Sequence, residues 1–265
     1  MKITLIITTY NWPASLLLVI QSIRNQTIWP NEIIVADDGS RNETKELINN
    51  INKEFEMNII HSWQQDNGFR VARSRNNAIF KSSGDYIILI DGDVILHPNF
   101  IKDHIDNAEQ GYFIQGSRAL LTAYETKKAL SRKIVNFSFF YPGLKNRKNA
   151  IYSKFLSSIF STKKNHLYGI KSCNMAFYKK DCINVNGFNN DFEGWGREDS
   201  EFVVRLINSG VNRKNVRFNV IQFHLWHNEN PRMLLSQNDA ILEHAIINHS
   251  QWCENGINSI GKNES

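Results

Sequence analysis

Residues 3–26, ITLIITTYNWPASLLLVIQSIRNQ, join a run rich in β-branched residues to a helical pattern that opens at Pro13. The run is typical of a buried strand, and proline suits the first turn of a helix because the N–H that it lacks would have no partner there. The unit recurs along the first hundred residues. Further strands are predicted over residues 31–39, 57–63 and 85–94, with further helices over residues 42–55, capped by Asn42, and 68–83.

Strands and helices that alternate at this spacing form parallel βαβ units, in which helices cover both faces of the sheet. The predicted fold class is therefore α/β, with a mainly parallel, Rossmann-like central sheet flanked by helices. After about residue 100 the alternation weakens into helices, basic loops and a few short strands, one of them within residues 217–227. No linker or repeat separates the halves, so residues 1–100 and 101–265 are expected to form a single domain.

The composition narrows the class of protein. No run reaches the roughly 18 to 20 apolar residues that cross a bilayer, and the first residues turn polar too soon for a signal peptide, so a cytoplasmic location is expected. Cys173, Cys182 and Cys253 are odd in number and lack metal-ligand spacing, which fits a reducing compartment and argues against a disulfide framework or structural zinc.

The net charge of +5 is unevenly distributed. Residues 126–180 contain thirteen Lys and Arg residues and no acidic residue, and aromatic residues lie between the basic ones. Such a segment can meet an anionic membrane surface or a phosphate-bearing substrate. It can equally be a solvated basic face with core aromatic residues behind it, and the pattern does not separate these readings.

Ligands of open parallel sheets bind beyond the carboxyl ends of the strands, where DGD places Asp91 and Asp93. Gly92 lets the backbone turn there, and residues two apart in a strand point the same way, so both carboxylates are expected to converge. Their oxygens suit Mg²⁺ or Mn²⁺ carrying substrate phosphates. Asp and Gly are also ordinary turn residues, and that alternative stays open for the triplet alone.

Two other strand ends carry polar groups. Asp37 and Asp38 follow a predicted strand, where Asp37 suits a simple loop role and Asp38 can accept hydrogen bonds from a base or ribose. Arg70, Arg73 and Arg75 surround a predicted helix start, which suits a diphosphate, but helical spacing turns Arg75 away from the other two. There is no Walker or G-x-G-x-x-G loop, which argues against a kinase or a nicotinamide enzyme.

The second half of the chain offers two further patterns. His224 and His227 are metal-ligand candidates only if they reach the Asp91/Asp93 site; otherwise they are packed or hydrogen-bonded histidines. In FEGWGREDSEF, residues 192–202, glycines flank Trp195, whose indole is a flat platform for a sugar. Glu198 and Asp199 begin a predicted helix, where carboxylates can accept a proton or simply stabilise the helix N-terminus.

Taken in order, TLIITTYNWP, IIVADDGS, GDYIILIDGDV and GWGREDSEF resemble the motifs of GT-A glycosyltransferases of family 2. The last block is similar to that of β-1,4-galactosyltransferases and of the galactosamine-transferring half of chondroitin polymerases. The resemblance covers about residues 2–100 and 170–232. It implies a nucleotide-sugar-binding half over residues 1–100 and an acceptor-binding half over residues 101–265.

The resemblance also implies roles on the donor side. Uridine would be held by Thr8, Tyr10 and Asp38, and the diphosphate side by Arg70 and Arg75. Asp91 and Asp93 match the Asp-x-Asp pair, with Asp93 as the direct Mn²⁺ ligand. His227 matches the histidine that completes the metal shell in galactosyltransferase-like members, and His224 is a second candidate.

On the acceptor side, the resemblance implies that Asp199 is the catalytic base and that Glu198 contacts the acceptor hydroxyl. Gly194 and Trp195 would form part of the sugar or acceptor platform. A third acidic position of some relatives is Ser200 here, so the identity of the acceptor stays open.

The implied reaction is an inverting, Mn²⁺- or Mg²⁺-dependent transfer of a hexose or N-acetylhexosamine from a UDP-sugar to a saccharide or glycolipid acceptor, in bacterial polysaccharide or lipooligosaccharide synthesis. Peripheral contact with the inner face of the plasma membrane is expected through residues 127–180, and no contact with nucleic acid. The alternatives are a sugar-phosphate nucleotidyltransferase, whose glycine-rich activation loop is missing, a basic nucleic-acid- or membrane-binding module without catalysis, and an inactive sugar-binding relative.

Overall fold

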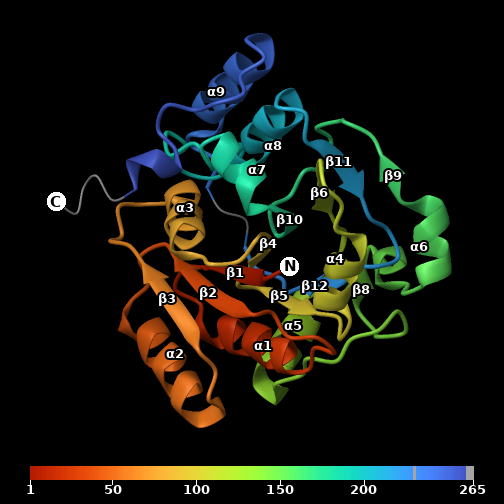
Figure 1. Ribbon diagram of the computed structural model, residues 1–265. Helices are drawn as coiled ribbons and strands as arrows, with labels where there is room; N and C mark the ends of the chain where they lie inside the picture. Colours follow the sequence, from red (N-terminus) through yellow and green to blue (C-terminus); the bar gives the residue numbers. More distant parts are fainter. Residues whose placement is uncertain (229–230, 261–265) are drawn as a thin grey trace.

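The computed structural model describes residues 1–228 and 231–260, in which the strands form two sheets (Figure 1). The larger sheet contains, in order across it, β3 (Ile59–Trp63), β2 (Glu32–Asp37), β1 (Ile3–Thr9), β4 (Tyr86–Asp91), β10 (Asn174–Tyr178), β6 (Tyr112–Gln115), β11 (Asn212–Asn215) and β9 (Thr162–Lys163). The smaller contains β5 (Val94–Leu96), β12 (Gln222–His224), β7 (Arg118–Leu121) and β8 (Leu144–Lys145).

Strands β3, β2, β1 and β4 are all parallel, as their alternation with helices predicts. The second half of the chain extends the same sheet in mixed directions, because β10 runs antiparallel to both β4 and β6 while β11 runs parallel to β6. Strands from both halves are therefore hydrogen-bonded within one sheet. This confirms a single α/β domain, whose sheet is parallel in its first half and mixed in its second.

The described residues also contain nine α-helices and two 3₁₀ helices. They are α1 (Pro13–Arg24), α2 (Asn42–Phe55), α3 (Val71–Lys81), α4 (Phe100–Asn107), α5 (Ala123–Arg132), α6 (Lys154–Phe160), α7 (Lys179–Asn184), α8 (Glu198–Asn208), α9 (Leu235–Ile247), η1 (Arg147–Ala150) and η2 (Ile257–Ser259).

Helices cover both faces of the larger sheet (Figure 1). Leu5 and Ile7 of β1 point to the face where α1, α2 and α4 pack, whereas Ile6 points to the face covered by α3, α7 and α8. This follows from the alternation of side chains along a strand. A third cluster joins α5 to the smaller sheet, with Phe223 of β12 and Ala129 of α5 among its buried residues.

The strand predicted over residues 85–94 is wrong in one respect, because it breaks into two strands that belong to different sheets. The break lies at Gly92, whose N–H donates to the Thr8 carbonyl oxygen at 2.6 Å. A Cβ at this position would lie 2.9 Å from the same oxygen, closer than real Cβ atoms come. The turn redirects the chain, so that β5 pairs with β12 instead of extending β4.

The predicted helix cap at Asn42 is also wrong. Arg41 occupies the N-cap position of α2 and Asn42 is the first helical residue. The Asn42 amide instead donates to Glu46, one turn further along, so it is not available to cap the helix.

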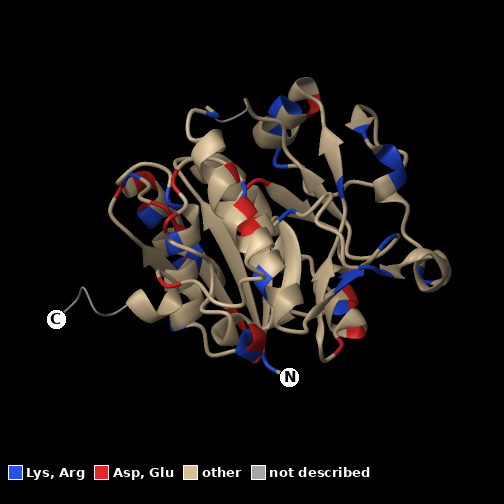
Figure 2. Cartoon of the chain, turned by 90° about the horizontal axis from the view of Figure 1, so that it is seen from above, with Lys and Arg blue, Asp and Glu red and all other residues tan. Residues whose placement is uncertain are grey.

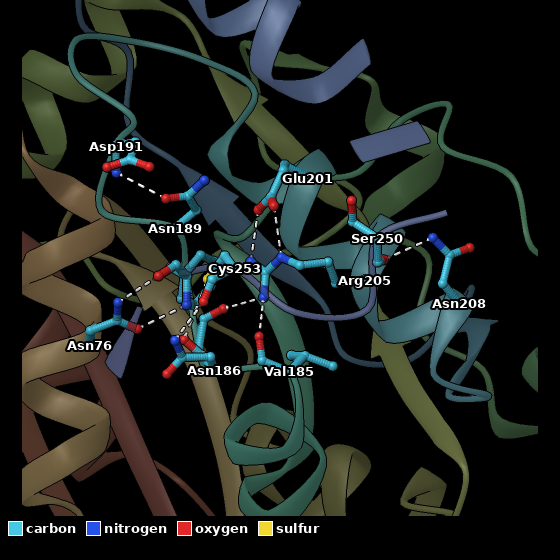
Figure 3. Close-up of polar contacts among 12 residues, drawn as sticks. Asn76, Val185, Asn186, Asn189, Asp191, Glu201, Arg205, Asn208, Ser250 and Cys253 are labelled. Carbon is cyan, nitrogen blue, oxygen red and sulfur yellow. Dashed lines mark hydrogen bonds and ion pairs between the residues drawn. The ribbon is translucent and has the colours of Figure 1, made fainter. Parts of the chain in front are cut away.

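Arg205 of α8 is paired with Glu201 of the same helix and fastens α8 to the loop after α7 (Figure 3). Arg205 is fully buried, and its Nε and Nη2 atoms lie 2.7 Å from the two Glu201 carboxylate oxygens. Its Nη1 atom donates to the carbonyl oxygens of Val185 and Gly187. Because a planar guanidinium presents its donors in fixed directions, this arrangement locks α8 against the end of α7.

The structure bears on two features that the composition addresses, membrane-spanning segments and the state of the cysteines. None of the helices within residues 1–228 and 231–260 is both long enough and apolar enough to cross a membrane. All three cysteines are free and buried, as the absence of a disulfide framework predicts.

Candidate active site

Polar side chains gather beyond the carboxyl ends of β1, β2 and β4, where open sheets of this kind bind ligands. The loop after β1 contributes Tyr10, the loop after β2 contributes Asp38, and the turn after β4 contributes Asp93. The N-termini of α3 and α8 reach the same region, because Arg75 of α3 contacts both Asp91 and Glu198.

Asp93, His224 and His227 form a cluster whose ligand atoms all lie within 4.8 Å of one another. The Asp93 Oδ2 atom is 3.1 Å from His227 Nε2 and 3.5 Å from His224 Nε2. β12 brings the histidines there by pairing with β5, and the Leu225 N–H donates to the Asp93 carbonyl oxygen at 2.9 Å. His224 and His227, which follow Asp93 by 131 and 134 positions in the sequence, thus lie next to it.

The donor set fits a divalent cation. The buried Asp93 Oδ1 atom has no hydrogen-bond partner among the described residues, so one carboxylate oxygen is left for another ligand. The His227 Nδ1 atom lies 2.7 Å from the Asn228 carbonyl oxygen. A backbone carbonyl in this position fixes the proton on Nδ1 and directs Nε2 towards a metal, as outer partners of metal-bound histidines do.

Burial and pairing act in opposite directions on this cluster. Burial alone would raise the pKa of Asp93, but His224 and His227 together lower it below its usual value. The hydrogen bond with Asp93 raises the pKa of His227 to about 9, whereas burial lowers the pKa of His224 to about 4. At neutral pH Asp93 is therefore ionised, His224 is neutral and His227 is protonated, and the Nε2 atom of His227 must release its proton to bind a metal.

Asp91 is turned away from the histidines. Its Oδ1 atom lies 3.6 Å from Nη2 of Arg75, and burial raises the pKa of Asp91 to about 6 although Arg75 opposes the shift. The structure thus gives the two carboxylates of the triplet different partners. Asp93 is in the metal-ligand cluster and Asp91 is not.

A sharply bent loop carries the acidic block to the N-terminus of α8. Gly194, Gly196 and Arg197 have φ angles of 70°, 107° and 79°, which are left-handed and cost strain at a residue with a side chain. The predicted tight bend around Trp195 is confirmed. Its consequence is that Glu198 and Asp199 begin α8 at the edge of the site.

The two carboxylates of α8 have different surroundings. Glu198 Oε1 lies 2.9 Å from Nη1 of the buried Arg75. Asp199 Oδ2 accepts a hydrogen bond from the Ser172 N–H at 3.3 Å. Burial first, and the negative charge of Glu198 second, raise the pKa of Asp199 to about 7. A carboxylate with this pKa exchanges protons near neutral pH, as a general base must.

Asp38 and Tyr10, two of the predicted nucleotide-binding residues, are both hydrogen-bonded within the protein. Asp38 is buried and accepts from the Arg70 N–H at 2.8 Å and the Gln64 side chain at 2.6 Å, while burial raises its pKa to about 6. The half-exposed Tyr10 donates its hydroxyl to Asp66 at 2.9 Å.

The remaining predicted residues have these contacts. Thr8 Oγ1 lies 3.5 Å from Arg75 Nε, and the Arg70 guanidinium lies 2.9 Å from the Glu193 carboxylate. Trp195 keeps 38% of its surface exposed, and the Arg232 guanidinium lies 4.9 Å above its ring. Arg75 contacts Asp91 and Glu198 and thus has other partners than Arg70, and Arg73 is exposed.

The sequence did not point to Arg118, at the start of β7. Its Nη1 atom lies 3.5 Å from the Cys173 sulfur, and its charge opposes the rise in the pKa of Asp91 and contributes to the lowered pKa of Asp93. No local pattern marks this arginine, because its neighbours come from β4, the turn after it and the segment before β10. Cys173 itself is buried, and burial raises its pKa to about 12, so its sulfur stays a neutral packing group.

Comparison with known proteins agrees with this arrangement. Residues 4–183 match the family model described as glycosyl transferase family 2, and residues 154–228 match that described as the N-terminal domain of galactosyltransferase. The first match covers the strands β1 to β4 and the Asp-Gly-Asp turn. The second covers the acidic block and both histidines of the cluster.

Among curated proteins, the chain is similar to the hyaluronan synthase of Pasteurella multocida, with 27% identity over 78% of this chain and 23% of that protein. It is also similar to the chondroitin synthase of Escherichia coli, with 26% identity over 81% of this chain and 33% of that protein. A Campylobacter jejuni GalNAc(5)-diNAcBac-PP-undecaprenol beta-1,3-glucosyltransferase shares 27% identity over 67% of this chain and 56% of that protein. The chain thus spans about a quarter to a half of the length of these relatives.

Among solved structures, S. aureus TarS 1–349 in complex with UDP superposes with a TM-score of 0.66 at 15% identity, over 94% of this chain and 66% of that one. The mannosyltransferase PcManGT from Pyrobaculum calidifontis, in complex with GDP-Man and Mn²⁺, gives a TM-score of 0.57 at 14% identity, over 84% and 56% of the two chains. At such identities the likeness confirms the GT-A fold alone. Because the family model matches more than half of the sequence, the chain belongs to glycosyl transferase family 2.

Proposed function

We propose that this protein is a metal-dependent, inverting glycosyltransferase that moves a hexose or N-acetylhexosamine from a UDP-sugar to a saccharide hydroxyl. The observation that carries the proposal is the adjacency of two groups of residues. The Asp93, His224 and His227 cluster suits the cation of a nucleotide diphosphate, and Arg75 links Asp91, two residues before Asp93, to Glu198 at the start of α8.

On the donor side, we assign Asp93, His227 and His224 to a Mn²⁺ or Mg²⁺ ion. When bound, the ion would neutralise the charge that develops on the departing UDP. Thr8, Tyr10 and Asp38 are proposed to hold the uridine, and Arg70 to lie on the diphosphate side. Asp91 is proposed to contact the donor beside Arg75, whose charge keeps this carboxylate from standing unpaired.

On the acceptor side, Asp199 removes the proton from the attacking hydroxyl, and Glu198 accepts a hydrogen bond from the acceptor. The hydroxyl oxygen forms the new bond to the anomeric carbon as the bond to UDP breaks, and this single displacement inverts the anomeric centre. A pKa of about 7 supports Asp199 as the base. Trp195, with Gly194 beside it, is proposed as the platform on which a sugar ring stacks.

Ligand-dependent thermal stability tests the donor assignment. UDP with Mn²⁺ at about a hundredfold above its Kd is expected to stabilise the native protein by about 2.7 kcal/mol, and UDP without metal by much less. Asp93→Asn should lose the metal-dependent part, whereas His244→Ala, which removes an exposed histidine of α9, should keep it. Equal stabilisation by UDP with and without Mn²⁺ would refute the metal assignment.

The relatives suggest a polysaccharide or lipooligosaccharide pathway. Three of them are named for hyaluronan, chondroitin and a GalNAc-containing undecaprenol diphosphate, which are saccharides or glycolipids. We propose an acceptor of this general class, extended at the inner face of the plasma membrane. Product analysis by mass spectrometry with a panel of UDP-sugars and saccharide acceptors tests this class directly.

Peripheral membrane contact through residues 127–180 is part of the proposal. Exposed apolar side chains occur there on α6, with Phe155 73% and Ile159 56% exposed. Figure 2 shows Lys and Arg residues along the right-hand side of the molecule, the side on which Figure 1 places α6 and β9. Ion pairs of Lys154 with Asp106 and of Lys163 with Glu109 partly neutralise the positive charge of these two lysines.

Co-sedimentation with vesicles tests this contact. Binding to phosphatidylglycerol vesicles at low salt, weakened by added salt, is expected because the attraction is electrostatic. Phe155→Ser should weaken it further. Failure to bind anionic vesicles at low salt would overturn the membrane proposal and leave the transfer reaction untouched.

A further inference from the structure

An open groove lies directly beside the candidate metal cluster. It has a volume of about 760 Å³, within the range of about 300–1,000 Å³ that holds small ligands. Its lining includes Trp12, Leu130 of α5, Trp226 and His227. Because His227 also lies 3.1 Å from Asp93, one residue belongs to both the cavity and the metal-ligand cluster. An occupant of this groove would therefore touch the reaction centre.

The walls of the groove are tied together. The backbone N–H of Trp226 donates to Thr126 Oγ1 of α5 at 2.7 Å, so the segment after β12 is fixed to that helix. The Trp12 ring packs edge-on against the His227 ring, with 6.1 Å between centroids. A hydrogen bond and ring packing therefore hold three segments together around the groove. Trp226 remains 45% exposed.

The chemistry of the lining favours hydrocarbon over sugar. Trp12, Trp226, Leu130 and Ala123 make its apolar surface, and Thr126 Oγ1 accepts a hydrogen bond from the backbone N–H of Trp226. A saccharide buried here would leave many hydroxyl groups without partners, which costs free energy for each one. A hydrocarbon chain carries no such groups and gains from every methylene that it buries.

The exposed charged side chains of α5 are cationic. Lys127 lines the groove, and the exposed Arg132 and Lys133 follow at the C-terminal end of the helix, whereas the Asp93 carboxylate lies behind His227. The helix's acidic residue, Glu125, is buried and occupied by the Tyr141 hydroxyl at 2.8 Å and the Lys128 ammonium at 3.4 Å. Such a rim complements an anionic group attached to an apolar chain.

From these observations we infer that the groove binds the hydrocarbon chain of a lipid-linked saccharide acceptor that carries a phosphate group. The inference rests on the proposed function and specifies its acceptor class. Continuity with His227 favours an acceptor over a phospholipid of the bilayer, because an acceptor must be bound at the reaction centre together with the donor. The chain lies between α5 and Trp226, and the basic rim faces its phosphate.

Two soluble probes with the same head group test the inference. Farnesyl phosphate and dimethylallyl phosphate are both allylic monophosphates and differ only in the number of isoprene units, and their binding to the full chain can be followed by calorimetry. Each buried methylene tightens binding about fourfold, so farnesyl phosphate should bind at least about tenfold more tightly. This advantage should persist with saturating UDP and Mn²⁺, since donor and acceptor occupy the protein together.

Variants of α5 provide the control. Leu130→Glu places a charge inside the groove and should abolish the chain-length advantage, while Tyr124→Glu, at an exposed position of the same helix outside the groove, should preserve it. If Leu130→Glu fails to fold, Ser131→Glu at the rim serves the same purpose. The inference is overturned if both probes bind equally, if Leu130→Glu and Tyr124→Glu behave alike, or if UDP displaces the long-chain probe.

A vesicle experiment separates the two sources of a lipid chain. If phosphatidylglycerol vesicles bind the wild type but not Leu130→Glu, while farnesyl phosphate has no advantage, the groove takes a bilayer lipid and the acceptor assignment is wrong. Calorimetry with these probes requires no sugar transfer. Loss of the groove proposal and loss of the proposed transferase activity are therefore distinguishable outcomes.

Discussion

The Nη1 atom of Arg75 lies 2.9 Å from Oε1 of Glu198, and this buried ion pair joins α3 to the first turn of α8. The same guanidinium lies 3.6 Å from Asp91. One cation thus connects a carboxylate at the end of a sheet strand with the acidic block that begins 107 residues further along the chain. From this position, we infer that Arg75 aligns the two halves of the site.

Replacement of Arg75 should impair both folding and activity. Arg75→Met leaves Glu198 buried without its cation, and breaking a buried pair in this way costs about 3–5 kcal/mol of unfolding free energy. Arg75→Lys keeps the charge but not the two-pronged geometry, so it should retain more stability while kcat falls. Chemical denaturation and steady-state kinetics measure these effects, with Arg73→Met, on the exposed side of α3, as the control.

Removal of the proposed base should slow the chemical step selectively. Asp199→Asn is expected to lower kcat by about 10²–10⁴, the usual contribution of general base catalysis, with little change in UDP affinity. Turnover with a transferable acceptor and calorimetric UDP binding together check this. A variant that transfers sugar at the wild-type rate would exclude Asp199 as the base.

The pKa of Asp199 has a consequence for stability. Because the pKa rises from 3.8 to about 7 on folding, the native state binds more protons than the unfolded state between about pH 4 and 7. This carboxyl therefore lowers stability as the pH rises through that window, and the cost is complete above pH 7. Asp199→Asn removes the ionisation, so its Tm should exceed that of the wild type at pH 8, and the difference should shrink towards pH 5. A Tm difference independent of pH would contradict this account.

The Arg205–Glu201 pair should matter far more than an exposed pair of equal spacing. Arg205→Met leaves a carboxylate buried without its cation and should cost about 3–5 kcal/mol, part of which the double variant with Glu201→Leu should restore. Lys102 and Asp106 are also four residues apart but are more than a third exposed, so Lys102→Met should cost less than about 1 kcal/mol. Similar losses of unfolding free energy for both substitutions would refute the distinction.

Substitution of Gly92 should damage the metal cluster without touching a ligand. A Cβ there would meet the Thr8 carbonyl oxygen at 2.9 Å, so Gly92→Ala forces the turn that carries Asp93 to shift. The expected results are a loss of about 1–3 kcal/mol of stability and weaker Mn²⁺-dependent binding of UDP. At Gly111 the φ angle is 78° and a Cβ would meet no atom, whereas Gly92 is not left-handed, so Gly111→Ala measures backbone strain without displacement of a neighbour.

Local patterns were sufficient for the first half of the fold. Strands β1 to β4 are recognisable because buried parallel strands need continuous β-branched runs, and their helices because Pro13 and the amphipathic spacing mark them. The acidic residues at the start of α8 and the glycines around Trp195 were also readable, since helix starts and tight bends depend on neighbouring residues. The order of four family motifs added the assignment of roles, which no single motif supports.

Only the tertiary structure decided which of these side chains meet. Asp93 reaches His224 and His227 because β12 pairs with β5, and Arg75 turns to Glu198 because α3 and α8 cover the same face of the sheet. The break of the chain at Gly92 follows from a hydrogen bond to Thr8, eighty-four residues earlier. Such contacts depend on strand register and helix packing across the whole domain, and the periodicity of a single segment carries no information about them.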